Sequence, residues 1–134
     1  MKKILSFIET NITNYNDLPS EGLRENEHNT TNKKLWGSRG VAAIKELAQI
    51  TNTVPINISI NKSGDCDRGY VSGFVNSKDG TKTVYISIND GMNDILYRTA
   101  KHAKDYTGGS NHTVSITKNG FDILQHFIIN YINQ

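Results

Sequence analysis

An alternating segment centred on Asp79-Gly80 limits the possible folds of this chain more than any other feature. Residues 69–76 and 82–88 are predicted strands, and residues 77–81 between them have the composition of a tight turn. An Asp-Gly pair between two such segments is typical of a β-hairpin. The second strand places three apolar side chains on one face, namely Val84, Ile86 and Ile88. The chain is therefore expected to contain an antiparallel sheet with a buried face.

Two further strands are predicted on either side of this hairpin. Residues 54–60 alternate Val54, Ile56, Ile58 and Ile60 with Pro55, Asn57 and Ser59, a period-two pattern with one buried face. Pro55 lacks an amide hydrogen, which favours an edge position or the start of a strand. Residues 112–117 alternate in the same way. The sheet is thus expected to have about four strands.

The first fifty residues predict two helices joined by a polar loop. Residues 3–14 have helical spacing, and a second helix is expected from an N-cap at Ser38 to about Asn52. Residues 16–34 lack periodicity and are expected to form a flexible loop. The predicted buried stripes are Ile4, Leu5, Ile8 and Ile12 in the first helix and Val41, Ile44, Leu47 and Ala48 in the second.

Two more helices are predicted after the hairpin. Asp90 can cap a helix that runs to about Tyr106 and ends before Gly108-Gly109, and Asn119 can cap a final helix. The predicted stripe of the former is Ile95, Leu96, Thr99 and Ala103, and that of the latter is Phe121, Leu124, Ile128 and Tyr131 or Ile132.

These elements predict an α+β fold in a single domain of 134 residues. The expected order is α-α-β-β-β-α-β-α, with an antiparallel-rich sheet of about four strands and helices packed on one face. Residues 1–15 form the amphipathic N-terminal helix in this interpretation, residues 16–34 the flexible loop, and residues 35–134 the α+β body.

Composition argues against several classes of protein. The formal net charge is only +2, so no whole-molecule field attracts nucleic acid or anionic membranes. Cys66 is the only cysteine, which excludes an intramolecular disulfide. No apolar run has the length that a signal peptide or a membrane span requires. We expect a cytoplasmic protein without membrane association, metal or cofactor.

Residues 97–116 gather most of the candidate functional side chains. If residues 90–106 are helical, Arg98, Lys101 and His102 share one polar face with Asp105, and this face could bind an anion. Alternatively, the cations at the end of that helix only complement its dipole. The candidate binding residues are Arg98, Lys101, His102, Lys104, Tyr106, His112 and Trp36. Trp36 is interpreted either as an exposed recognition residue or as a hydrophobic staple before a helix.

Two classes of function remain open. The first is a non-enzymatic binding protein that acts on a protein or nucleoprotein partner and could contact nucleic acid directly through residues 97–112. An excess of Asn, Ile and Lys, typical of AT-rich coding sequence, suggests an accessory or inhibitor protein of a bacterial mobile element or phage, for example one directed at a host defence nuclease. The alternative is a metal-independent nuclease or phosphate-handling enzyme, with His102 and His112 as acid and base and Arg98 as a charge stabiliser. This alternative requires the two histidines to share a cleft.

Overall fold

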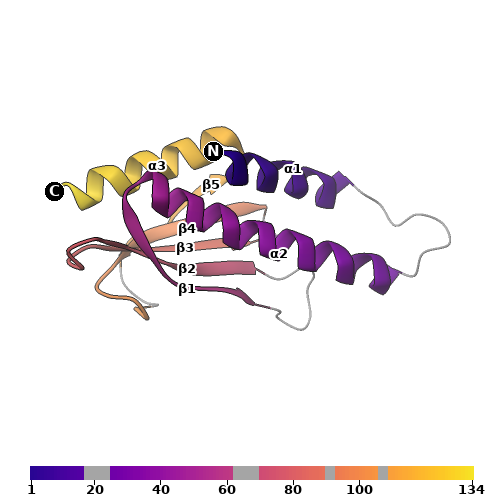
Figure 1. The fold of residues 1–134 in the computed structure, drawn as a ribbon, viewed down its shortest axis with the longest axis horizontal. Helices are drawn as coiled ribbons and strands as arrows, with labels where there is room; N and C mark the ends of the chain where they lie inside the picture. Colours follow the sequence, from indigo (N-terminus) through magenta and orange to yellow (C-terminus); the bar gives the residue numbers. More distant parts are fainter. Residues whose placement is uncertain (17–24, 62–69, 90–92, 106–108) are drawn as a thin grey trace.

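The computed structural model describes the backbone of residues 1–16, 25–61, 70–89, 93–105 and 109–134, and their side chains except those of residues 13–16 and 25–34. In these ranges the chain forms three helices and five strands (Figure 1). The helices are α1 (Lys2–Asn16), α2 (Glu25–Ile50) and α3 (Lys118–Ile132). The strands are β1 (Thr53–Asn61), β2 (Tyr70–Ser77), β3 (Thr83–Asn89), β4 (Asp94–Ala100) and β5 (His112–Ser115). The fold is α+β, as the sequence predicts.

The five strands form one antiparallel sheet in the order β1-β2-β3-β4-β5, so each strand pairs with its neighbours in the chain. The predicted hairpin is confirmed: β2 and β3 pair from Tyr70↔Asn89 to Asn76↔Thr83. Gly80 adopts a φ of 78° in the turn, and its amide donates to the Ser77 carbonyl at 2.9 Å. The Asp-Gly pair therefore supplies the left-handed residue that the turn requires.

The three helices cover one face of the sheet and enclose the core against it (Figure 1). The predicted central core residues Ile86 and Leu124 are both fully buried, as are Ile44 and Leu47 of α2. Phe7 of α1 contacts Phe121 of α3 edge-on, with ring centroids 6.3 Å apart. A single apolar layer thus joins all three helices to the sheet.

The predicted helix over 90–106 is wrong, because its described part contains β4. Residues 94–100 pair with all seven residues of β3. Ile95 and Tyr97 are buried in the core, whereas Asp94 and Leu96, which alternate with them, are half-buried. A short apolar run fits the periodicity of a helix or of a strand, and pairing with the edge of β3 favours the strand. Asn93, with a φ of 53°, turns the chain just before β4. Gly108 lies outside the described residues.

Helix α2 begins at Glu25, so the predicted start at Ser38 is also wrong. Ser38 lies inside this helix on its exposed side, whereas Asn52, with a φ of 58°, follows its end as expected. The predicted loop over 16–34 is wrong at residue 16 and at residues 25–34, which are helical, and residues 17–24 lie outside the described residues. The cap of α3 is Thr117 and not Asn119: its hydroxyl accepts from the Gly120 amide at 3.0 Å.

The predicted buried face of β1 is only partly realised. Val54 and Ile60 are exposed by 43% and 42%, because β1 is an edge strand whose register with β2 shifts between Ile56 and Ser59. Asn57 has a φ of 55° within this bulge. A Cβ on Gly73 of β2 would lie 2.8 Å from the Ile58 Cα, so glycine permits the close approach of the bulged strand. This bulge shapes the surface described next.

Candidate functional site

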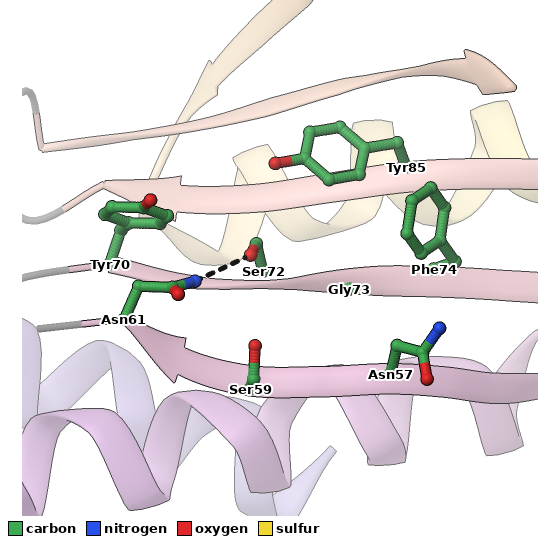
Figure 2. A pocket seen from close by; sticks show the side chains of 8 residues that line it. All are labelled: Asn57, Ser59, Asn61, Tyr70, Ser72, Gly73, Phe74 and Tyr85. Carbon is green, nitrogen blue, oxygen red and sulfur yellow. Dashed lines mark hydrogen bonds between the residues drawn. The ribbon is translucent and has the colours of Figure 1, made fainter. Parts of the chain in front are cut away.

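The sheet face opposite the helices carries a hollow of about 260 Å³. Its walls come from the bulged edge of the sheet, with Asn57, Ser59 and Asn61 from β1 facing the aromatic rings of Tyr70, Phe74 and Tyr85 (Figure 2). Phe74 is 1% exposed yet lies outside the hydrophobic core cluster, because it points to the face without helices. The hollow therefore combines amide and hydroxyl groups with aromatic surface.

Two contacts order the walls of this hollow. The Asn61 amide nitrogen donates to the Ser72 hydroxyl at 3.1 Å across β1 and β2 (Figure 2). The rings of Phe74 and Tyr85 lie with centroids 5.1 Å apart and planes inclined by 51°. The described residues that line the hollow are all uncharged. Its chemistry suits a neutral group that can both stack and accept or donate hydrogen bonds.

Arg98 connects the hollow to the segment that the sequence singles out. Its side chain is 3% exposed, and its guanidinium carbon lies 4.6 Å from the centroid of the Tyr85 ring. The same guanidinium donates through Nη2 to the Asp105 carbonyl at 2.8 Å. Arg98 thus holds the turn after β4 against the helix-free face, beside an aromatic wall of the hollow.

The predicted polar helix face does not form, because Arg98 lies in β4. Lys101, His102 and Lys104 instead lie on a turn over 101–105. The Lys101 amide donates to the Asp105 carboxylate at 2.9 Å, and the Asp105 amide donates to the His102 carbonyl at 3.1 Å. Lys104 has a φ of 85° in this turn. Lys101, His102 and Lys104 are all exposed, and Figure 1 shows the segment after β4 leaving the sheet on the side away from α3. The turn therefore exposes Lys101 and Lys104, and Arg98 links its backbone to Tyr85 in the wall of the hollow.

His112 lies on the other side of the sheet. It pairs with Tyr97 across β4 and β5, stacks on the Tyr97 ring at 5.3 Å, and lies 5.4 Å from the ring of Phe127 in α3. Burial raises the pKa of Tyr97 beneath it. In the described structure no hydrogen bond or ring contact joins His112 to His102, whose Nδ1 lies 2.8 Å from the Ala103 carbonyl. The sequence cannot reveal this separation, because it depends on which face each residue of β4 and β5 occupies.

Trp36 is an interior residue. It is fully buried, its ring lies 5.4 Å from that of Phe7, and its Nε1 donates to the Asn11 side-chain oxygen at 3.0 Å. Asn11 in turn donates to the Asn93 side chain at 2.8 Å, which links α1 and α2 to the start of β4. Trp36 therefore is neither the exposed residue nor the staple that its sequence context suggests. Tyr106 lies outside the described residues.

The sequence interpretation missed the residues of the hollow. Asn57 and Ser59 occupy the polar positions of the predicted strand over 54–60, and Asn61 follows its predicted end. Tyr70 and Tyr85 lie within the predicted hairpin. Aromatic residues at solvent-side positions of a hairpin are the signal that could have identified this surface. The remaining information, the cross-strand register and the bulge, requires the folded sheet.

Comparisons with protein-family models, with curated proteins and with solved structures find no match to this chain. Among the described residues, histidine, cysteine and acidic side chains form no group of three that could hold a metal ion. The helices of this part of the chain include none with the length and apolar character needed to cross a membrane. The site must therefore be interpreted from its own geometry.

Proposed function

We propose that this chain is a small cytoplasmic binding protein without enzymatic activity, and that it acts on a protein or nucleoprotein partner through the helix-free face of its sheet. The observation that carries the proposal is the contact of Arg98 with both Tyr85 and the Asp105 carbonyl. Through Arg98, the exposed turn over 101–105 is joined to Tyr85, which lines the hollow. The Asn-, Ile- and Lys-rich composition favours an accessory or inhibitor role in a bacterial mobile element or phage, with a host defence nuclease as one candidate target.

Binding explains the surface better than catalysis does. A nuclease built on His102 and His112 needs both imidazoles within hydrogen-bond reach of one phosphate. His112 packs against Tyr97 and Phe127 on the helix side, whereas Arg98 ties the turn of His102 to the opposite face. Arg98 is itself almost fully buried. The arrangement therefore favours the binding interpretation.

The test is affinity capture from a bacterial lysate, with protein and nucleic acid in the captured fraction analysed together. We expect the wild-type chain to retain one stoichiometric partner, and the Lys101→Glu, Lys104→Glu variant to lose it. Both side chains are exposed, so this double change should leave unfolding cooperative.

The matched control is Lys2→Glu, Lys45→Glu, which alters the net charge equally on exposed positions of α1 and α2. Capture should survive in this control. Equal capture by the two double variants would show that the turn over 101–105 is not the contact surface, and would contradict the proposal.

A further inference from the structure

We infer that the hollow accepts an unpaired nucleobase of a single-stranded nucleic acid, whose flanking phosphates lie against Lys101 and Lys104. This inference rests on the proposed function and specifies the chemistry of the same surface. It identifies the partner as one that contains nucleic acid, because the two parts of the surface match the two parts of a nucleotide.

The lining of the hollow matches the chemistry of a base. An unpaired base offers two aromatic faces and an edge of hydrogen-bond donors and acceptors, and proteins recognise it by stacking and by hydrogen bonds to that edge. Tyr70 supplies aromatic surface at one end of the hollow, and Figure 2 shows the Tyr85 hydroxyl directed toward that end. The side chain of Asn57 carries both a donor and an acceptor and is exposed at the wall.

Within the described part of the chain, the side chains of Asn57 and Ser59 make no hydrogen bond to another residue. Their polar groups therefore remain available to a ligand. The Asn61 amide is instead committed to Ser72 and fixes the wall between β1 and β2.

The volume of the hollow sets the size of the group that can enter. At about 260 Å³ it lies just below the range of roughly 300–1,000 Å³ that is typical of sites for drug-sized ligands. One ring system fits this space, whereas a longer ligand must continue along the surface. A polymer that inserts one ring and extends beyond the hollow satisfies both conditions.

The distribution of charge on this surface resembles that of a nucleotide, which joins a neutral base to an anionic phosphate. Among the described residues that line the hollow, none carries a charge, which suits the neutral base better than the phosphate. Lys101 and Lys104 are exposed on the turn that Arg98 holds beside Tyr85. A neutral base in the hollow would thus place its anionic phosphates toward the cations of the turn. A duplex is excluded from this mode, because its bases are stacked and paired.

The experiment measures fluorescence anisotropy of labelled oligonucleotides mixed with the full chain. The probes are a single-stranded 12-mer of mixed sequence, its duplex, and an abasic 12-mer that keeps the phosphates but has no bases. We expect the single strand to bind more tightly than both other probes. Removing one stacking ring with Tyr70→Leu should weaken single-strand binding by about 5- to 100-fold and leave abasic binding unchanged.

A second hollow variant, Asn57→Gly, removes the amide while glycine keeps the left-handed backbone of the bulge. It too should weaken binding of the single strand alone. The control Tyr131→Leu changes an aromatic residue on α3, on the helix side of the sheet, and should bind all probes as the wild type does. Lys101→Glu, Lys104→Glu should weaken single-stranded and abasic probes alike and flatten the dependence on salt.

Thermal melts establish that each variant is folded, and backbone amide shifts of the wild type on titration with the single strand provide a readout that needs no variant. Shifts confined to residues 57–61, 70–74, 85 and 101–105 would support the inference. Equal affinity for single-stranded and abasic probes, or no binding of any oligonucleotide, would overturn it. If the lysate experiment still yields a protein lost on Lys101→Glu, Lys104→Glu, the proposed function stands and the partner is a protein without nucleic acid.

Discussion

At the scale of single residues, the hollow depends on the backbone conformation at two positions of β1 and β2. Asn57 adopts a left-handed conformation that asparagine tolerates better than most residues, and Gly73 leaves room for the strand opposite it. Neither role is visible in the sequence, where Asn57 occupies an ordinary polar position of a strand. Residue-scale features of this kind emerge only from the pairing of β1 with β2.

Replacing Gly73 with alanine should lower the free energy of unfolding by about 1–3 kcal/mol. The added Cβ would lie 2.8 Å from the Ile58 Cα, a backbone atom that can move only if β1 moves. Urea denaturation measures the change. Gly80→Asn is the control, because nothing lies within 4 Å of a Cβ there and asparagine accepts the φ of 78°. A Gly73→Ala variant as stable as this control would contradict the proposed close approach.

Asp79 should make the hairpin turn sensitive to acid. Its carboxylate accepts hydrogen bonds from the Ser77 hydroxyl at 2.6 Å and from the Thr81 amide at 3.0 Å and hydroxyl at 2.7 Å, which lowers the pKa of Asp79 from 3.8 to about 2. Because the folded-state pKa is depressed, the stabilisation is present above the unfolded pKa and is lost as pH falls through the folded one. The stability difference between wild type and Asp79→Ala should therefore be constant near neutral pH and shrink between pH 3.8 and about 2.

Melting temperatures recorded across this pH range check the expectation. Lys78→Ala is the control, since it changes the adjacent exposed residue of the turn and leaves the Asp79 carboxylate in place. A difference between wild type and Asp79→Ala that stays constant down to pH 2 would show that the carboxylate is not held by these hydrogen bonds.

At the scale of elements, the sequence predicts best where several signals agree. The β2–β3 hairpin combines alternation with an Asp-Gly turn, and α3 combines helical spacing with the buried stripe Phe121, Leu124 and Ile128. The prediction for β4 was wrong because Ile95, Leu96 and Thr99 fit a helical stripe as well as a strand. Pairing with β3 decides between the two, and pairing is not a local property.

The shared core of sheet and helices should respond to truncation from either side. Ile86→Ala in β3 and Leu124→Ala in α3 should each cost about 2–5 kcal/mol, because both side chains are fully buried and neither site can collapse without moving its element. Ile123→Ala provides a matched control in the same helix, since that side chain is 45% exposed. Chemical denaturation of all three variants measures the effect. Losses for Ile86 or Leu124 no larger than the loss for Ile123 would contradict the assigned faces.

At the scale of the whole molecule, the predicted fold class and much of the element order are confirmed, whereas the candidate site was predicted only in part. Lys101, His102 and Lys104 lie on an exposed turn and not on the predicted helix. Trp36 and Arg98 are instead buried. Trp36 donates to Asn11 within the helix layer, and Arg98 donates to the Asp105 carbonyl and so holds the turn over 101–105. The hollow was not predicted, because its walls come from three strands whose relative register no single segment encodes.

The arrangement of the sheet should also appear in amide hydrogen exchange. β3 is flanked on both sides by long strands and is covered by the helix layer, whereas β1 is an exposed edge and β5 has only four residues. We expect the amides of Val84, Ile86 and Ile88 to exchange most slowly, and those of β1 and β5 much faster. Exchange followed by NMR or mass spectrometry measures the order. Protection of β1 equal to that of β3 would indicate that a further layer covers the edge.

The strand order that matches the chain order has a consequence for the path of folding. A meander assembles by closing one short hairpin after another, which requires little loop-closure entropy. The contact of Phe7 with Phe121 is different, because it joins residues far apart in the sequence and seals the core between α1 and α3. We therefore expect the sheet to form early and these two rings to dock after the rate-limiting step, so that truncation of Phe7 accelerates unfolding and truncation of Val84 slows folding.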